Sequence, residues 1–423
     1  MTEIPRPEMN NNFRSTADYP VVPKPYEVPI ENIDLSDSRL PSSGLQLDYY
    51  TRIREEDPVH FIQNSKFGPY WSITTYKDLQ EVESHPEIYS SDWTNGGVLI
   101  LDGMKLGFMA MDDPLHSKHR MTLMPLMAPS SLQKMGVSIR ERTRSLLQSI
   151  AIGQPFNWVD EVSIPLTTRM LAILLGFPFD EETILPVWTE WSTNVDAGAD
   201  PVLSKKRDEI LLDMGVRLRK LYEARKNLPP QDDVLSILAH SAEMSDLNDE
   251  DFQGLMSLLV VGGNDTTRNS MTALIQAIDR YPQEWEKVKQ DRSLASSAIH
   301  ETIRWWSPVA HQRRTVTEDT MLDGKQLKKG DKVVLWFKSG NHDEAVFPNA
   351  ATFDISRKNV RRHIAFGYGI HRCFGARLGE LQLSILLDEI FDLGLSVKPV
   401  SKDIRSETCM INGFEEQMVI VEK

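Results

Sequence analysis

Most of the chain carries apolar residues at three- and four-residue spacing, which predicts helices. This spacing is clearest in the segments 139–150, 164–175, 205–227 and 291–305. Short stretches rich in β-branched and aromatic residues predict strands. These stretches are 59–61, 70–73, 332–337 and 416–421. Because they lie towards both ends of the chain, any sheet must be assembled from distant segments. The pattern therefore predicts a mainly α protein with a minor β part.

One predicted helix is unusually long. Asn248 followed by Asp251 is typical of a helix N-cap, and Tyr281-Pro282 predicts the end of the helix. The ~33 residues between them would span ~50 Å, which is of the order of the diameter of a compact chain of this length. Residues 255–261 are apolar apart from Ser257, which indicates burial nearly all round. We therefore expect this helix to run through the middle of the molecule.

The first forty residues differ in composition from the rest. Six prolines fall within the first thirty residues, together with three consecutive asparagines at 10–12. This composition predicts a loosely structured segment over residues 1–40. No linker, repeat or low-complexity stretch divides the remaining chain, so we expect a single domain over residues 41–423.

Composition and charge exclude several classes of protein. The 423 residues include 47 Lys and Arg against 61 Asp and Glu, a formal net charge of −14, whereas a nucleic-acid binder normally has a basic domain. The two cysteines, Cys373 and Cys409, are too few for a disulfide scaffold, a four-cysteine zinc site or an iron–sulfur cluster. No apolar run approaches the ~20 residues of a membrane span, and the N-terminus does not resemble a signal peptide. We expect a soluble, cytoplasmic protein with a deep buried site.

The long helix contains a motif, Gly262–Thr267, that needs explanation. Each of its two glycines costs ~1 kcal/mol relative to alanine inside a helix. Thr266 can donate a hydrogen bond to the Gly262 carbonyl and bend the helix, which would open a groove for a small ligand. Asp265 is an acid beside an apolar stretch, where an unpaired charge is costly. A kink with a surface acid is the alternative.

A second motif is Phe366-Gly367-Tyr368-Gly369-Ile370-His371-Arg372-Cys373-Phe374-Gly375. Its three glycines allow the backbone to turn tightly and approach a bound group. Helical periodicity follows from Ala376 to about Phe391, so Cys373 lies at a helix N-terminus, where the dipole and free N–H groups stabilise a thiolate. The motif fails as a dinucleotide fingerprint because Arg372 replaces the last glycine.

A third motif, His300-Glu301-Thr302-Ile303-Arg304, nearly matches the zinc pattern H-E-x-x-H. Arg304 occupies the second ligand position and cannot bind a metal. Glu301 and Arg304 lie on one helix face, where they can form an ion pair. On the surface such a pair is worth only ~0.5 kcal/mol. A buried pair, especially one joined by Arg357, would fix the cysteine loop.

Together these motifs resemble the cytochrome P450 superfamily of haem-thiolate monooxygenases over nearly the whole chain. The resemblance implies haem b as cofactor, Cys373 as the axial ligand of its iron, and O₂ as co-substrate. It makes Asp265 and Thr266 the proton-delivery pair, and Glu301, Arg304 and Arg357 a structural triad. It also implies a set of haem-binding residues, which are Cys373, His116, Arg120, Arg314, His371, Phe366, Gly367 and Gly375.

Three stretches, 67–72, 260–270 and 301–305, resemble the soluble bacterial alkane and fatty-acid terminal hydroxylases in particular. This resemblance implies hydroxylation at or near the end of a medium-length alkane or fatty acid. The carboxylate of a fatty acid would meet Lys105 or a residue of 196–207. The expected pocket residues are Val98, Leu99, Phe108, Leu259, Gly262, Val309, Ala310, Met410, Ile411 and Phe414. A terpenoid or steroid hydroxylase, and a haem-thiolate sensor without turnover, are the alternatives.

The chain lacks cysteines for an iron–sulfur cluster and has no flavin-domain segment, so we expect an external ferredoxin with its reductase to supply electrons. Locally basic residues flank the cysteine loop, and an acidic ferredoxin would dock on them. They are Arg357, Lys358, Arg361, Arg362, His363, Arg372 and Arg377. Solvated or triad charges are the alternative explanation. We expect no nucleic-acid partner and a monomer.

Overall fold

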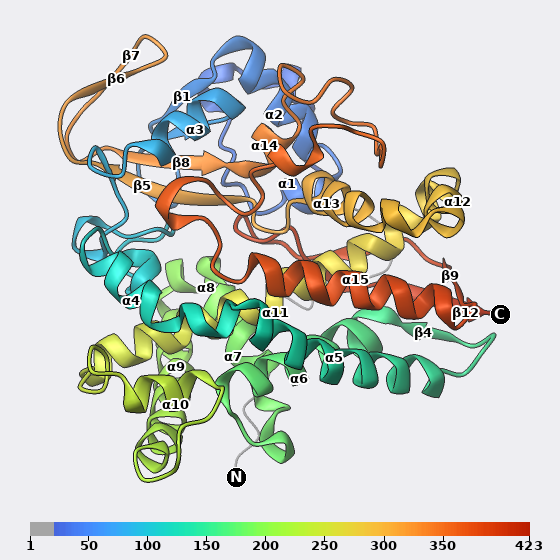
Figure 1. Ribbon diagram of the computed structural model, residues 1–423. Helices are drawn as coiled ribbons and strands as arrows, with labels where there is room; N and C mark the ends of the chain where they lie inside the picture. The colour runs from blue at the N-terminus through green and yellow to red at the C-terminus, as the bar shows by residue number, and fades with distance from the viewer. Residues whose placement is uncertain (1–20) are drawn as a thin grey trace.

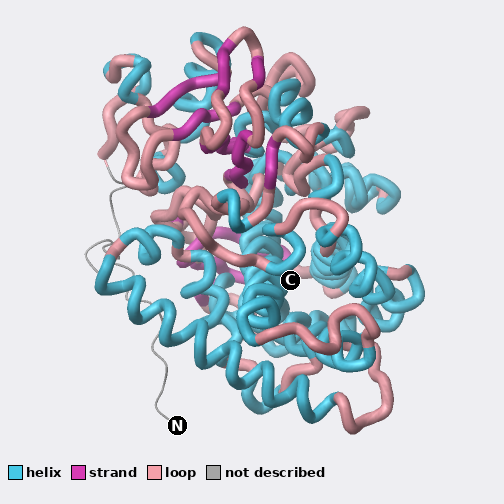
Figure 2. The backbone as a smooth tube through the Cα atoms, turned by 90° about the vertical axis from the view of Figure 1, so that its left-hand side faces the viewer, coloured by secondary structure: helices cyan, strands magenta, loops and turns pink. Residues whose placement is uncertain are grey.

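The structure is a computed structural model that describes residues 21–423. Helices make up most of it, and the larger sheet lies at one end of the molecule (Figures 1 and 2). The helices are α1 (Leu40–Ser43), α2 (Gln46–Glu56), α3 (Tyr76–Ser84), α4 (Leu115–Leu123), α5 (Pro129–Ser149), α6 (Ile164–Leu175), α7 (Ile184–Thr193), α8 (Val195–Ala199), α9 (Pro201–Arg225), α10 (Val234–His240), α11 (Asp249–Arg280), α12 (Pro282–Gln290), α13 (Ala295–Trp306), α14 (Phe337–Asn341) and α15 (Ala376–Asp392).

The strands form four small sheets in the described part of the chain. They are β1 (Val59–Ile62), β2 (Tyr70–Ile73), β3 (Tyr89–Ser90), β4 (Pro155–Asn157), β5 (His311–Val316), β6 (Thr320–Leu322), β7 (Lys325–Leu327), β8 (Lys332–Trp336), β9 (Ser396–Pro399), β10 (Ile404–Arg405), β11 (Phe414–Glu416) and β12 (Met418–Glu422). The mainly α fold with a minor β part is confirmed.

The largest sheet joins distant parts of the chain, as predicted. Its five strands have the order β1-β2-β8-β5-β3, with β2 and β8 parallel and the other pairs antiparallel. All five residues of β8 are buried, because the strand lies inside the sheet with both faces covered. A smaller sheet, β4-β12-β9, pairs the C-terminal strand with residues 155–157.

Helix α11 is the long helix that the sequence predicts. The Asn248 side chain accepts a hydrogen bond from the Asp251 N–H, and the helix ends at Tyr281, directly before Pro282. It packs against α6, α7, α9, α13 and α15, so it is covered on nearly every side. Figure 1 shows it crossing the middle of the molecule behind α15.

Part of the N-terminal segment packs against the rest of the molecule. Within residues 21–40, Ile33 and Leu35 are buried, and the Tyr49 hydroxyl donates a 2.7 Å hydrogen bond to the Pro23 carbonyl. Two short 3-10 helices, Pro25–Glu27 and Ile30–Asn32, lie in this segment, and the chain around them places a few apolar side chains in the core. The prediction of a loosely structured segment over residues 1–40 stays a prediction, and residues 1–20 lie outside the described part. That residues 41–423 form one domain stays a prediction.

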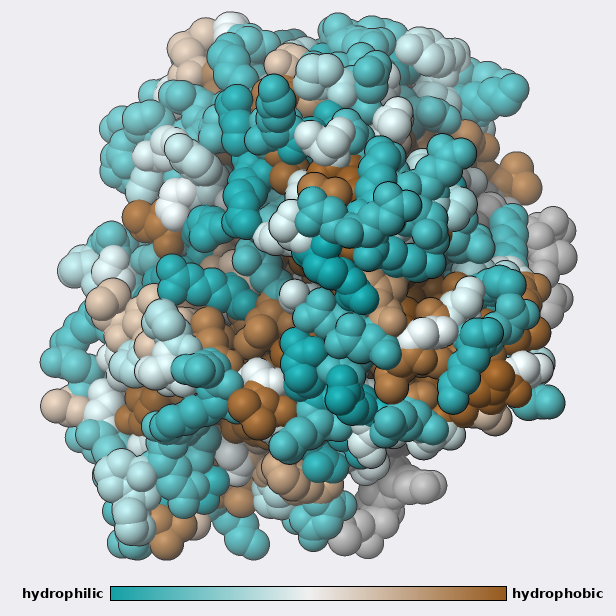
Figure 3. Space-filling view, turned by 45° about the vertical axis from the view of Figure 1, so that its right-hand side comes forward, coloured by the Kyte–Doolittle hydropathy of each residue, from teal (hydrophilic) through white to brown (hydrophobic). Residues whose placement is uncertain are grey.

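One face of the molecule is mostly hydrophilic (Figure 3). Figure 3 shows a face on which hydrophilic residues predominate and hydrophobic residues form smaller patches between them. Across residues 21–423, we find no helix that combines the length and the apolar character needed to cross a membrane.

Candidate active site

A cavity beside α11 brings the sequence motifs together. Its walls come from the loop before α4, from α4 itself, from the glycine-containing part of α11 and from the cysteine loop. The predicted site residues that line it are Leu99, Phe108, His116, Arg120, Leu259, Gly262, Thr266, Val309, Phe366, Gly367, His371, Cys373, Gly375, Met410 and Ile411. Segments more than 250 residues apart in sequence therefore meet at one site.

The cysteine loop holds Cys373 three residues before α15 begins. Its N–H donates a 2.7 Å hydrogen bond to the Phe366 carbonyl, which closes the loop. Gly367 and Gly369 have φ values of 70° and 64°, a region that favours glycine. A Cβ on Gly369 would also overlap the Glu83 carbonyl. The glycines are therefore required by the loop, as the sequence predicts.

The Cys373 side chain is exposed towards the cavity, while protein surrounds the rest of it. This burial raises the pKa of the Cys373 thiol above its ordinary value, although the Gly375 N–H and the Arg120 and Arg372 guanidinium groups act to lower it. The predicted thiolate at a helix N-terminus is therefore not produced by the protein alone. Coordination to a metal ion removes the proton from a thiol, so iron would supply what the helix does not.

Two histidines test whether the cavity suits a haem group. Both ring nitrogens of His371 and Nε2 of His116 are buried and have no hydrogen-bond partner among residues 21–423, whereas Nδ1 of His116 lies 3.5 Å from the Asp113 carboxylate. The two rings lie 4.2 Å apart. Burial lowers the pKa of His371 to about 2 and also lowers the pKa of His116. Such polar atoms are costly without a partner. Haem propionates would supply that partner, with Arg120 beside them.

Two glycines of the cavity wall, Gly262 and Gly375, also show whether the cavity suits haem. A Cβ on Gly262 or on Gly375 would meet no atom within 4 Å, apart from the local backbone. Both residues line the cavity, so each leaves a flat stretch of wall on which a planar group can lie. The Cys373 thiol, the buried histidine nitrogens and the open space beside Gly262 and Gly375 all fit haem.

Arg314 differs from the other predicted haem-binding residues because it does not line the cavity. Its guanidinium forms a 2.8 Å ion pair with Glu83, and both side chains are only 2% exposed. Glu83 also accepts a hydrogen bond from the Tyr368 N–H in the cysteine loop. Burial raises the pKa of Glu83 to about 7. No sequence signal marked Glu83, which belongs to an ordinary polar helix, α3.

Only one member of the predicted proton-delivery pair faces the cavity. The Thr266 hydroxyl lines the cavity and donates a 3.1 Å hydrogen bond to the Gly262 carbonyl, as predicted. Asp265 lies on another face of α11, where it forms a 2.5 Å ion pair with Arg268. Arg268 is also 3.6 Å from Glu190. Asp265 is therefore buried rather than a surface acid.

The triad residues meet as predicted. Glu301 and Arg304 form two hydrogen bonds of 2.7 Å, and Arg357 Nε lies 3.4 Å from the same carboxylate. All three side chains are at most 5% exposed, which excludes the surface-pair alternative. Arg304 donates to the Asn341 carbonyl as well, so the cluster ties α13 to the segment that leads into the cysteine loop.

Seven of the ten predicted pocket residues line the cavity, and three do not. Val98 and Ala310 are fully buried in the apolar core. Phe414 stacks on Trp306 with ring centroids 4.3 Å apart. These three residues are apolar and close in sequence to true lining residues, so their side chains could not be told apart without the tertiary structure. Gln312 also lines the cavity and was not among the predicted residues.

Comparison with known proteins agrees with this geometry. The family model described as cytochrome P450 matches residues 216–403. Linalool 8-monooxygenase of Pseudomonas putida is 33% identical over 412 residues, which cover 93% of this chain and 99% of the relative. The chain belongs to the cytochrome P450 family.

Two solved P450 structures are similar over nearly the whole chain. Cytochrome P450-153 from Novosphingobium aromaticivorans is 39% identical with a TM-score of 0.87, and covers 92% of this chain and 99% of its own. CYP153D17 from Sphingomonas sp. PAMC 26605 is 39% identical with a TM-score of 0.89, and covers 93% and 100%. The predicted superfamily and P450 fold are confirmed.

This P450 is therefore a monooxygenase that uses haem b, held by a cysteine thiolate, and O₂. Cys373 is the cysteine in the cavity, because Cys409 is buried in the core elsewhere. Membership of a monooxygenase family removes the support for a ligand sensor without turnover.

Proposed function

We propose that this P450 hydroxylates a linear medium-chain alkane or fatty acid at or near its terminus. The observation that carries the proposal is the lining of the cavity away from the cysteine loop. That lining consists mainly of Leu99, Phe108, Leu258, Leu259, Val309, Met410 and Ile411. Such a wall contributes ~25 cal/mol per Å² of buried apolar surface and offers few polar groups to orient a functionalised ring. It suits a flexible apolar chain.

Bound haem supplies the centre at which O₂ is held and activated. The chain contributes the environment of that centre. The apolar wall orients the substrate and excludes bulk water, while the Thr266 hydroxyl is a polar group on the α11 wall of the cavity. Because that hydroxyl donates its proton to the Gly262 carbonyl, its lone pairs are free to accept a hydrogen bond from a water molecule. Thr266 would thus hold a proton donor, with Asp265 behind it as the acid.

A ferredoxin is the proposed electron donor, and the exposed cations near the cysteine loop support it. Arg357 and His363 are buried and drop out of the predicted basic surface. The remaining members are exposed, and no carboxylate of residues 21–423 forms an ion pair with them; they are Lys358, Arg361, Arg362, Arg372 and Arg377. Glu380 acts on Arg361, Arg372 and Arg377 only at longer range. A group of exposed cations without ion pairs, in a protein of net charge −14, favours an acidic partner.

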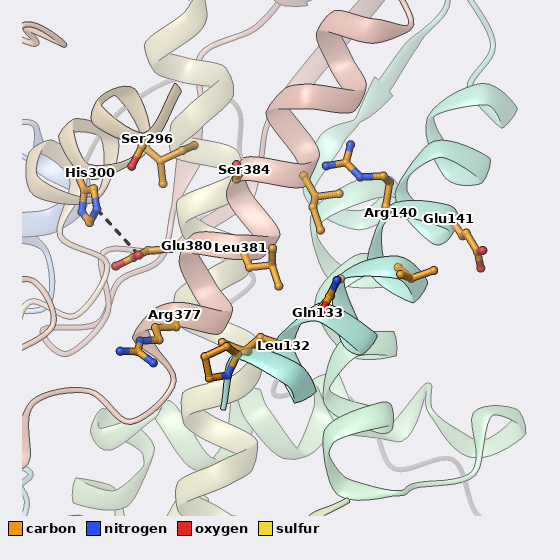
Figure 4. Close-up of a pocket in the computed structure, with 15 residues that line it drawn as sticks. Leu132, Gln133, Arg140, Glu141, Ser296, His300, Arg377, Glu380, Leu381 and Ser384 are labelled. Carbon is orange, nitrogen blue, oxygen red and sulfur yellow. Dashed lines mark ion pairs between the residues drawn. The ribbon is translucent and has the colours of Figure 1, made fainter. Parts of the chain in front are cut away.

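A pocket of about 760 Å³ opens beside these cations, between α5, α13 and α15. Leu132 and Leu381 line it, and the charged side chains of Arg377 and Glu380 also border it (Figure 4). Apolar surface with a charged rim is the usual composition of a protein interface. This pocket therefore supports docking at the face that adjoins the cysteine loop. The predicted cytoplasmic location and monomeric state stay predictions.

The substrate proposal is tested with the purified enzyme, a surrogate ferredoxin and its reductase. Linear alkanes, fatty acids, terpenoids and steroids are compared by the Soret shift on binding and by product formed per NADH. We expect terminal or near-terminal alcohols from the linear compounds. A terpenoid hydroxylase is the second candidate, because the relative named linalool 8-monooxygenase is 33% identical. Turnover confined to terpenoids or steroids would replace the linear-chain proposal.

A further inference from the structure

Arg207, on α9, is a buried cation that forms no ion pair with a carboxylate of residues 21–423, although its exposed neighbour Asp208 acts on it at longer range. Arg207 is only 5% exposed. It lies where α9 meets the end of α7 and the loop that forms part of the cavity wall. Among residues 21–423, its hydrogen bonds go to the Trp191 carbonyl at 2.9 Å, the Ser192 carbonyl at 3.3 Å and the Met104 sulfur at 3.2 Å. No carboxylate there forms an ion pair with it.

An uncompensated buried guanidinium is expensive, because the group remains charged and has lost much of its hydration. Burial acts to lower the pKa of Arg207, which expresses the same cost. The two carbonyls belong to the last turn of α7, so Nε and Nη2 cap that helix. Nη1 has no hydrogen-bond partner among residues 21–423. It lies 4.0 Å from the position that a Cβ on Gly198 would occupy.

Two other cations near this side of the cavity already have carboxylate partners, while Lys206 is only half-buried and lies over the Trp191 ring. Lys105 forms ion pairs with Asp251 at 2.6 Å and with Glu250 at 3.3 Å. Lys66 pairs with Asp196. Of the groups that the sequence offered for a substrate carboxylate, Lys105 and residues 196–207, Arg207 is the buried cation that still lacks an anion.

Met104 contacts Arg207 and packs near the substrate cavity, whose lining includes neither residue. Its sulfur contacts the guanidinium, and its side chain packs against the apolar cluster that contains the cavity residues Leu99 and Met410. Methionine is unbranched and flexible, so it can move aside without disturbing the cluster. A linear chain in the cavity would then place its polar end at Arg207.

We propose that Arg207 binds the carboxylate of a fatty-acid substrate, which makes fatty acids rather than alkanes the preferred class. This inference rests on the proposed linear-chain function. A carboxylate at Nη1 would receive a charge-assisted hydrogen bond and would neutralise the guanidinium. An alkane of the same length would gain only burial of its apolar surface, and a primary alcohol would gain a weaker, neutral hydrogen bond.

The test measures binding to the haem-loaded enzyme by the Soret shift, which does not depend on turnover. The ligands are a fatty acid and the primary alcohol and alkane of the same chain length. The variants are Arg207→Gln, which keeps donors for the α7 carbonyls, and Arg207→Lys, which keeps the charge. Lys205→Gln removes an exposed positive charge two residues away and is the matched control. Thermal unfolding confirms that each variant is folded.

We expect the fatty acid to bind about 10-fold to 100-fold more weakly to Arg207→Gln, the size of a lost charge-assisted hydrogen bond. The alcohol and alkane should bind unchanged, Arg207→Lys should retain part of the fatty-acid affinity, and Lys205→Gln should behave as the parent. Equal weakening of all three ligands would show that Arg207 only caps α7, and unchanged fatty-acid binding would also overturn the inference. If the parent bound terpenoids but no linear compound, the proposed function itself would fall, and this inference with it.

Discussion

Asp265 and Arg268 form a buried ion pair, with 2.5 Å between the carboxylate Oδ1 and Nε, one turn apart on α11. Thr266, the neighbour of Asp265, lies instead on the cavity wall. The two groups proposed for proton delivery therefore point to different surroundings, because successive residues of a helix are rotated by ~100°. Asp265 must leave Arg268 before it can approach the cavity.

The first prediction concerns this ion pair. Arg268→Gln should lower the free energy of unfolding by ~3–5 kcal/mol, because it leaves the Asp265 carboxylate buried without its cation. Chemical denaturation measures the change. Adding Asp265→Asn should recover part of the loss, since the Asp265 charge would be gone while Glu190 would still have lost the nearby guanidinium. If Arg268→Gln were as stable as the parent, the pair would not hold this part of α11.

The second prediction concerns Thr266. Thr266→Ala should keep haem and substrate binding but divert reducing equivalents to peroxide, because the hydroxyl that holds a water in the cavity is lost. Positioned proton transfer is typically worth ~10²–10⁴-fold in rate. Product and peroxide formed per NADH measure the effect. Thr272→Ala is the control, because the Thr272 hydroxyl donates to the Arg268 carbonyl and lies outside the cavity lining. Unchanged coupling in Thr266→Ala would remove the role.

The third prediction concerns the two cysteines. Cys373→Ala should abolish the absorption band typical of the reduced carbon monoxide complex of a haem-thiolate protein, because Cys373 is the cysteine that faces the cavity. Cys409→Ala should keep the band, since Cys409 is 1% exposed within the apolar core. The reduced carbon monoxide difference spectrum decides between them. A band that persisted in Cys373→Ala would contradict the assignment.

The fourth prediction concerns Glu83. Burial raises its pKa to about 7 in the folded protein, above its ordinary value. The folded state then binds more protons than the unfolded state between the two pKa values, so this group's contribution to stability is lost as the pH rises towards 7. Glu83→Gln should remove that decline, which thermal unfolding across this pH range would measure. The same slope in the parent and in Glu83→Gln would show that other groups cause it.

The fifth prediction concerns the ferredoxin surface. Arg361→Glu should raise the KM for an acidic ferredoxin and flatten its salt dependence, because the Arg361 side chain is exposed and has no carboxylate partner among residues 21–423. Lys329→Glu is the control, and it makes the same charge change beside the β6–β7 hairpin. This hairpin lies at the opposite end of the molecule from α12 (Figure 1), so the substitution should leave the KM unchanged. Equal effects of the two substitutions would indicate a general charge effect rather than docking.

Much of the secondary structure follows from local pattern alone. The segment 164–175 is α6 and the segment 70–73 is β2, as predicted. Each has the spacing of apolar residues typical of its kind of element, and residues that end the element follow it. The helix predicted over 139–150 begins ten residues earlier, at Pro129. Leu132 and Met135 in this added stretch pack against the core, but polar and small residues surround them in the sequence. Element ends on polar surfaces depend on caps and on neighbouring packing, which the apolar pattern does not record.

By itself, the sequence determined the cysteine loop, the buried triad and the Gly262–Thr266 bond, because each depends on residue types at fixed, short spacing. Only the tertiary structure decided which side of an element faces the cavity. It placed Asp265 against Arg268, Arg314 against Glu83 and Phe414 on Trp306. It also left Arg207 buried without an ion pair to any carboxylate of residues 21–423. Each of these outcomes depends on partners distant in sequence or on the direction of a single side chain. A local pattern of apolar residues predicts roughly which face of a helix is buried, but it does not predict which residues pack against that face.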